Sequence, residues 1–384
     1  MRRRWEERVK VRTQAGRFRL GWWAVLAIAF GSAIPHSQAS VAVLVEQPYG
    51  HLGTFSPGGH SAIFLDHVCA ETPVKLRPCQ PDELGVVISR YDGIQHLDWL
   101  AVPLTGYLYA VDTAADIPAS MDREREVALR DIYRRAHLES IAPDLPDGKA
   151  PGGNWYELAG SAYDRAIFGF SVKTTAEQDA GLIALFNDRR NVERYNGAFT
   201  NCADFARVTI NRFYPGAIHR NFIADFGVTS PKQVARQLTK YASRHPEVEL
   251  EVFKVPQVRG SLPRSHANEG VSEALVRRYG LPIVLISPVT AALMLTAYIG
   301  DGRFEMPRHA PILDVGVLEA EARVLPALVA PAGGPEQEAM LTRSLRLPEP
   351  EAALPFPDPP SMPRVEVVAV PQGKTEPAGA SQPF

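Results

Sequence analysis

Residues Tyr195–Pro215 read YNGAFTNCADFARVTINRFYP, and within them a turn-rich segment passes into an amphipathic helix at Cys202. Thr200 and Asn201 are good helix-capping residues, and the apolar side chains that follow recur at helical spacing. A thiol in the first turn of a helix faces unpaired backbone N–H groups and the positive end of the helix dipole, which favour the thiolate. The stretch therefore predicts a helix that begins at Cys202 and carries a nucleophile; the alternative is a small buried side chain.

A partner for this thiol stands upstream, in the sequence Gly58-Gly59-His60. His60 opens the apolar run HSAIFL (residues 60–65), which predicts a strand beside another at residues 41–46 (VAVLVE). A neutral imidazole can accept the thiol proton and return it to a leaving group. We therefore expect His60 to act as a general base; the structural alternative is a polar residue at the end of a strand.

Glu71 is the candidate for the third member of a catalytic triad. Residues 68–71 are expected to return beside the strand of His60, and a turn at residues 66–67 would bring Glu71 opposite that histidine. A carboxylate beside an imidazole fixes its tautomer and stabilises the imidazolium. A solvated side chain is the equally weighted alternative for Glu71.

The order of these motifs resembles the circularly permuted NlpC-like papain fold of lecithin:retinol acyltransferase and its relatives. GGHSAIFL precedes TNCADFA by more than a hundred residues, whereas in ordinary papain-like enzymes the cysteine comes first. The resemblance covers about residues 41–255 and implies an α+β fold with an antiparallel sheet packed on helices. It also implies Cys202 as the nucleophile and His60 as the base. Glu71 falls roughly where the family keeps a third polar group, often another histidine.

The resemblance implies thiol chemistry on an amide or ester, by hydrolysis or acyl transfer, with a peptide or a lipid as substrate and no cofactor. Asn201 and the backbone N–H groups at the start of the helix would stabilise the oxyanion or orient the reacting groups. The alternative is a non-catalytic envelope module that keeps the fold as a ligand-binding or interaction surface. A net charge of −2 gives no electrostatic case for a nucleic-acid partner.

The amino-terminal segment, residues 1–39, has the three parts of a secretory signal. Its first nineteen residues hold eight Arg and Lys, an apolar run follows at residues 20–34, and Ser37 and Ala39 are spaced as a signal-peptidase site requires. An uncleaved anchor is the alternative. Either interpretation predicts an exported protein of the periplasm or cell envelope.

The three cysteines predict one disulfide. Cys69 and Cys79 lie ten residues apart between apparent strands, and oxidising compartments preserve such bridges. Cys202 is then the odd thiol, which needs its own explanation in an exported chain. A zinc site is the rival, but the sequence has no CxxC pair or closely spaced histidine pair. We therefore expect no metal.

Further elements can be expected along the chain. A loop at Asn154–Tyr156 could form part of a binding rim. Residues 256–278 are expected to form a linker with a short helix. Strands are expected at 85–91, 99–111 (broken near Pro103), 163–172 and 249–255, and helices at 121–138, 176–187 and 231–242.

Residues 279–300 (YGLPIVLISPVTAALMLTAYIG) contain no charged side chain and are long enough for a continuous transmembrane helix. The alternative is a buried core helix or hairpin. The tail at residues 331–384 contains 12 of the 33 prolines, and its composition predicts disorder. Together these features predict a membrane-anchored envelope protein.

Overall fold

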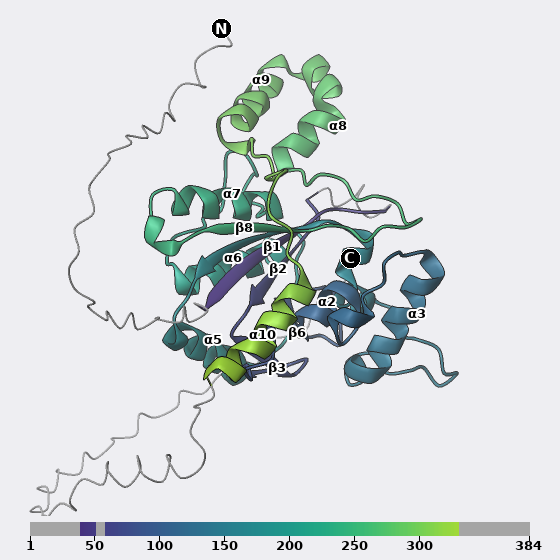
Figure 1. Cartoon of the computed structure of the whole chain (residues 1–384). Coiled ribbons are helices and arrows are strands. Elements are labelled where there is room, and N and C mark those ends of the chain that lie inside the picture. The colour runs from purple at the N-terminus through teal and green to yellow at the C-terminus, as the bar shows by residue number, and fades with distance from the viewer. Residues whose placement is uncertain (1–38, 51–57, 330–384) are drawn as a thin grey trace, which may run out of the picture. The chain divides into compact units, whose positions relative to one another are not determined.

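The computed structural model describes residues 39–50 and 58–329 (Figure 1). The predicted signal segment and the Pro-rich tail lie outside the described residues. A six-stranded sheet of order β6-β5-β2-β1-β7-β8 is packed on helices, and each neighbouring pair of strands is antiparallel. The predicted α+β class, with an antiparallel sheet packed on helices, is therefore confirmed.

The elements follow the chain in a simple order. The sheet contains β1 (Ser40–Glu46), β2 (His60–Leu65), β5 (Val86–Ser89), β6 (Leu100–Pro103), β7 (Ile167–Lys173) and β8 (Glu251–Val255). The α-helices are α2 (Leu104–Tyr109), α3 (Arg123–Tyr133), α4 (Ser161–Asp164), α5 (Ala176–Asp188), α6 (Cys202–Phe213), α7 (Pro231–Ala242), α8 (Val271–Ile286), α9 (Pro288–Ala297) and α10 (Val315–Val329). Shorter helical turns are η1 (Ala114–Asp116), η2 (Arg134–Leu138), η3 (Asn154–Leu158), η4 (Pro246–Val248) and η5 (Tyr298–Gly302).

Side-chain alternation along the central strands produces two separate cores. Val41, Val43 and Val45 face α5, α6 and α7 on one side of the sheet. Ala42 and Leu44 face α2 and α4 on the other side. Successive residues of a strand point to opposite faces, so a strand covered by helices on both sides is apolar throughout. This explains the uninterrupted apolar sequence of β1, and it places Glu46 on the same face as Leu44.

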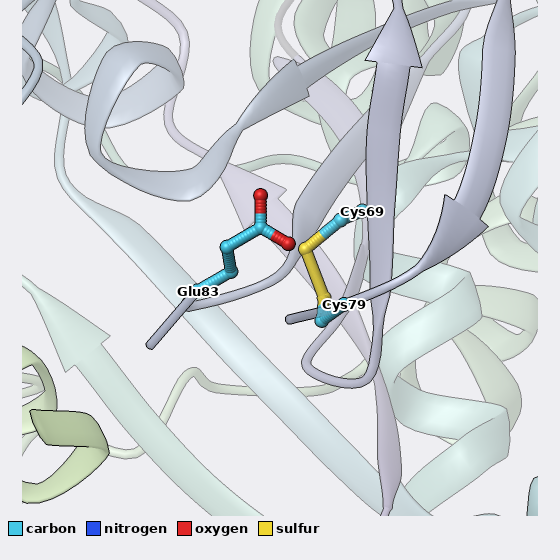
Figure 2. A group of neighbouring side chains, drawn as sticks. All are labelled: Cys69, Cys79 and Glu83. Atoms are coloured by element: carbon cyan, nitrogen blue, oxygen red, sulfur yellow. A yellow bond between two sulfur atoms is a disulfide. The ribbon is translucent and has the colours of Figure 1, made fainter. Parts of the chain in front are cut away.

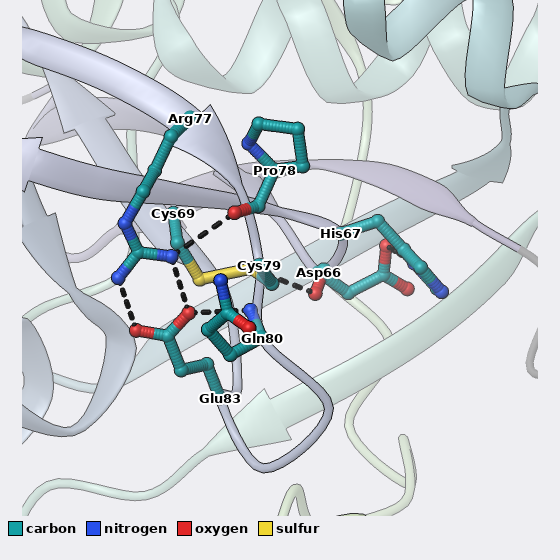
Figure 3. The surroundings of a disulfide bond; sticks show 8 residues. All are labelled: Asp66, His67, Cys69, Arg77, Pro78, Cys79, Gln80 and Glu83. Carbon is teal, nitrogen blue, oxygen red and sulfur yellow. Dashed lines mark hydrogen bonds and ion pairs between the residues drawn. A yellow bond between two sulfur atoms is a disulfide. The ribbon is translucent and has the colours of Figure 1, made fainter.

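The segment after β2 forms a small hairpin of its own rather than returning along the sheet. β3 (Val68–Thr72) pairs with β4 (Lys75–Pro78), whereas β2 pairs with β5 on that side. Cys69 and Cys79 are joined by a disulfide that closes this hairpin (Figure 3), as predicted. Cys202 is free, as also predicted. Arg77 beside the bridge donates two hydrogen bonds of 2.6 Å to Glu83. The expectation that residues 68–71 lie beside β2 was wrong.

The expected strand over residues 99–111 ends at Pro103 and continues as the helix α2. Leu104 to Tyr109 are all buried in this helix, and Ala110 ends it in the left-handed conformation at φ 49°. Tyr107 therefore points into the core between α2 and the sheet, where its hydroxyl reaches Glu46.

Residues after β8 form hydrogen bonds with the strands of the sheet and with the loop before β2. Asn268 donates hydrogen bonds of 2.7 Å to the carbonyls of Glu46 and Gly58, and thereby joins the end of β1 to the loop before β2. Further on, the backbone of Lys254 exchanges hydrogen bonds with the segment that precedes α10. Residues expected to form a linker therefore help to hold the ends of the central strands.

The expected continuous transmembrane helix is broken into two. α8 ends at Ile286, and the Ser287 hydroxyl accepts a hydrogen bond from the Thr290 N–H at the start of α9. Pro288 explains the break, because proline disfavours helical conformation in the preceding residue and cannot donate to the turn before it. The two helices contact each other and form a hairpin (Figure 1). Among the residues that the structure describes, no helix has the length and apolar character needed to cross a bilayer.

Candidate functional site

Cys202 occupies the first position of α6, as the capping residues predicted. The Asn201 side-chain oxygen accepts a hydrogen bond of 2.9 Å from the Asp204 N–H, which caps the helix. Its amide nitrogen donates to the carbonyls of Gly197 and Thr229, at 3.1 and 3.0 Å. The side-chain amide of Asn201 thus holds the two loops beside Cys202, because its N–H groups donate to a carbonyl in each loop.

His60 lies at the start of β2, directly opposite Glu46 in the strand register. The glycine before it is required by the geometry. Gly59 has φ +73°, and a Cβ there would lie 2.0 Å from the Glu46 carbonyl oxygen. The glycine therefore lets the incoming loop pass close to the end of β1. It places the imidazole of His60 where the two central strands β1 and β2 meet the loops.

Cys202 and His60 line the same cleft, which has a volume of about 480 Å³. Tyr195 and Asn201 line the cleft beside α6. Asn154 and Tyr156, from the loop that was expected to border a binding site, line it as well. Both candidate residues are 92% buried, with 8% of their surface exposed. The ring nitrogen Nε2 of His60 has no hydrogen-bond partner among the described residues. A buried acceptor or donor left in this state is available to a ligand or to a neighbouring thiol.

Burial governs the protonation of both groups. It raises the pKa of the Cys202 thiol to about 11, although backbone N–H groups of Ser61, Cys202 and Ala203 oppose this shift. Burial also lowers the pKa of His60 well below its ordinary value, and the positive charge of Arg165 acts in the same direction. The expectation that the helix start lowers the thiol pKa was wrong, because desolvation outweighs the N–H groups. The resting pair is a neutral thiol and a neutral imidazole.

An aromatic ring, rather than a carboxylate, holds the imidazole. Tyr91 stacks on His60 with ring centroids 4.2 Å apart and planes inclined by 6°. The Tyr91 hydroxyl donates a 3.0 Å hydrogen bond to the carbonyl of Glu157, which fixes the stacking ring in turn. The contact that orients the imidazole ring in this structure is therefore this stacking on Tyr91.

Behind this pair lies a buried network of charged and polar groups. The fully buried Glu46 carboxylate accepts hydrogen bonds from the hydroxyls of Tyr107 and Ser161 and lies 3.2 Å from Arg165 Nη1. Arg165 also pairs with Glu157. Burial raises the pKa of Glu46, against the effect of the nearby guanidinium. Sequence reasoning missed this network, although Glu46 follows Leu44 on the same face of a strand and is the first charge in that strand.

Glu71 lies elsewhere. Its side chain is about half exposed on β3, pairs with Lys75 at 2.9 Å, and lines a second cavity of about 420 Å³. It does not line the cleft of Cys202 and His60. The prediction that Glu71 faces His60 was wrong because the chain turns back directly after Thr72, so that β3 pairs with β4 and not with β2.

One group of potential metal ligands occurs among the described residues, formed by Cys69, Cys79 and Glu83 (Figure 2). The two sulfurs are bonded to each other, and metal binding requires thiolates. The Glu83 carboxylate is occupied by Arg77. The group is consequently a disulfide with a neighbouring ion pair, which does not suit a metal ion.

Comparison with known proteins identifies no relative: no family model, no curated protein and no solved structure matches the chain. The function must therefore be argued from the cleft itself.

Proposed function

We propose that this protein is an exported thiol hydrolase or acyltransferase of the cell envelope that acts on an amide or ester through Cys202 and His60. The observation that carries the proposal is the pair itself, in which a free thiol at a helix start and an imidazole with an unpartnered nitrogen line one cleft. The permuted papain-like order of the two motifs supports it. A peptide or a lipid of the envelope supplies the carbonyl group.

In this mechanism the nucleophile forms during attack. The Cys202 thiol passes its proton to His60 as the sulfur bonds to the carbonyl carbon, because neither group is charged at rest. The imidazolium then gives the proton to the departing amine or alkoxide, which leaves a thioester on Cys202. Water or an acceptor alcohol or amine resolves the thioester with His60 again as the base.

The developing oxyanion has donors close to the sulfur. Backbone N–H groups of Cys202 and Ala203 lie at the start of α6 and already interact with the thiol. Burial, with a smaller contribution from Cys202, raises the pKa of Tyr195 to about 12, so its hydroxyl stays protonated at neutral pH and can donate as well. Fixed donors in a dry cleft stabilise such a charge strongly.

The test is acyl-enzyme formation with an activated p-nitrophenyl ester. The full chain should release a burst of p-nitrophenol and carry the acyl group on Cys202, as located by peptide mass mapping. Cys202→Ala should abolish the burst, and His60→Gln should slow it by a factor of about 10²–10⁴. A matched control is His67→Gln, since His67 pairs with Asp66 on the surface and does not line the cleft. An unchanged burst in Cys202→Ala contradicts the proposal.

The dependence of the burst rate on pH, on the acidic side, tests whether His60 is the general base. The lowered pKa of His60 means that its imidazole stays neutral as the pH falls below the ordinary histidine value of 6.5. The burst rate should therefore persist below that pH and fall only when His60 becomes protonated. A limb centred near 6.5 or above would show that the base is another group.

The second candidate is a ligand-binding module that has no turnover. The raised pKa and burial of Cys202 favour it, because a structural thiol has the same properties. It predicts that envelope peptides or lipids bind in the cleft equally well to Cys202→Ala and to the unaltered chain, while no ester tested acylates the protein.

A further inference from the structure

The helical hairpin α8–α9 exposes large apolar side chains along most of its length. The exposed fractions reach 85% for Ile286, 76% for Leu285 and 73% for Leu281, and α9 contains no buried residue. Exposed patches of this extent mark binding surfaces in soluble proteins. The hairpin's large apolar residues with more than 45% exposure are Tyr279, Leu281, Val284, Leu285, Ile286, Val289, Leu293, Leu295 and Ile299.

The hairpin does not pack as an ordinary amphipathic pair of helices. α9 makes its main contacts with α8 and η5, so its outer surface has no element of the fold to cover it among the described residues. The residues between 279 and 300 include no charged side chain. A hairpin that is apolar on its outward surface is stabilised when that surface leaves water.

The charged side chains that flank the hairpin indicate which kind of partner its apolar surface would bind. Arg277 and Arg278 come just before the uncharged run, and Asp301 and Arg303 come just after it; the side chains of the three arginines are exposed. Arg277 forms an ion pair with Glu269, whereas Arg278 and Arg303 form no ion pair with another of the described side chains. An apolar hairpin flanked by exposed arginines matches a lipid surface, where acyl chains receive the apolar side chains and headgroup phosphates receive the cations.

We propose that the α8–α9 hairpin is a monotopic membrane-binding element that inserts into the interface of an anionic lipid surface without crossing it. A second copy of the chain fits less well, because a symmetric contact would bring the arginine borders of both hairpins together. The proposal does not rest on the thiol chemistry of Cys202. It does place the cleft next to the lipid, since Leu275, Arg278 and Tyr279 of α8 line that cleft.

The test places an environment-sensitive fluorophore on the hairpin. Leu293→Cys is labelled in the full chain carrying Cys202→Ser, so that the new thiol is the one that reacts. The matched control is Ile132→Cys on α3, because the two native side chains are 66% and 63% exposed. A local probe reports the hairpin even if another segment brings the protein to the vesicle.

Vesicles of phosphatidylglycerol and phosphatidylcholine in equal parts should shift the emission at position 293 to the blue and leave position 132 unchanged. The double substitution Arg278→Gln and Arg303→Gln should raise the lipid concentration that gives half of the blue shift about tenfold. With vesicles of pure phosphatidylcholine, the same substitution should raise that concentration by a smaller factor. The absence of a shift at 293, or equal shifts at both positions, would overturn the proposal. A blue shift that grows with protein concentration without vesicles would assign the surface to a second copy instead.

Discussion

Behind His60 the protein buries charged groups, whereas along α8–α9 it exposes apolar ones. Glu46 and Arg165 are each at most 4% exposed, while Leu285 and Ile286 are more than three-quarters exposed. Both arrangements oppose the usual partition of side chains between core and surface. The buried charges are compensated within the fold by hydrogen bonds and ion pairs. The exposed apolar groups have no such compensation within the described residues, so they point to something outside the chain.

The first prediction tests the compensated region. Arg165→Met removes the guanidinium between Glu46 and Glu157 and leaves buried carboxylates without their cation. We expect a loss of about 3–5 kcal/mol in the free energy of unfolding, measured by urea denaturation. The control is Arg135→Met, whose half-exposed ion pairs with Asp131 and Asp144 should contribute about 1 kcal/mol or less. Equal effects of the two substitutions would mean that the buried network is no more important than surface pairs.

The second prediction concerns the thiol that faces this network. At about pH 8, a thiol with a pKa of about 11 is ionised about a hundredfold less than one at its ordinary value of 9.0. Alkylation of Cys202 by iodoacetamide should therefore be at least that much slower in the folded chain than after unfolding in urea. The rate should keep rising as the pH increases beyond 9. A folded rate equal to or above the unfolded rate would indicate an activated thiolate at rest.

The third and smallest effect belongs to the hairpin. Leu285→Ser should change the free energy of unfolding by about 0.5 kcal/mol or less, because the side chain is already in water. Leu44→Ala, in the sheet core, should cost about 2–5 kcal/mol in the same assay. A hairpin substitution that destabilises as much as Leu44→Ala would show that the surface is covered by part of this chain in solution.

Local signals in the sequence located the starts of α6 and α7. The cap at Asn201 predicted the start of α6, and Ser230 followed by Pro231 predicted the start of α7. Both signals work within one helical turn, where side chain and backbone meet directly. The strand of His60 could also be predicted, because its apolar run has clear ends. The cleft's two central candidates were therefore identified before the fold was known.

Contacts between distant segments could not be obtained in this way. Nothing near Glu46 shows that Arg165 will lie beside it, 119 residues later. The stacking of Tyr91 on His60 has the same origin. The β3–β4 hairpin that carries Glu71 away from His60 is instead a local feature, since Thr72 pairs with Lys75. Pro288 was a local signal, but the apolar character of its surroundings favoured an unbroken helix and hid its effect. The buried network and the stacked ring depend on which elements pack together, whereas the helix break and the β3–β4 hairpin were local features that the sequence interpretation missed.

The pairing of β1 has a consequence for the time course of folding. β1 pairs with β2 shortly after it in the chain, but its other edge waits for β7, and Ser40 pairs with Lys173. During synthesis, this apolar edge stays open while more than a hundred further residues emerge. Such non-local pairing slows folding, and an open apolar edge can pair with other chains. The edge of β1 is therefore open to pairing with other chains until β7 closes the sheet.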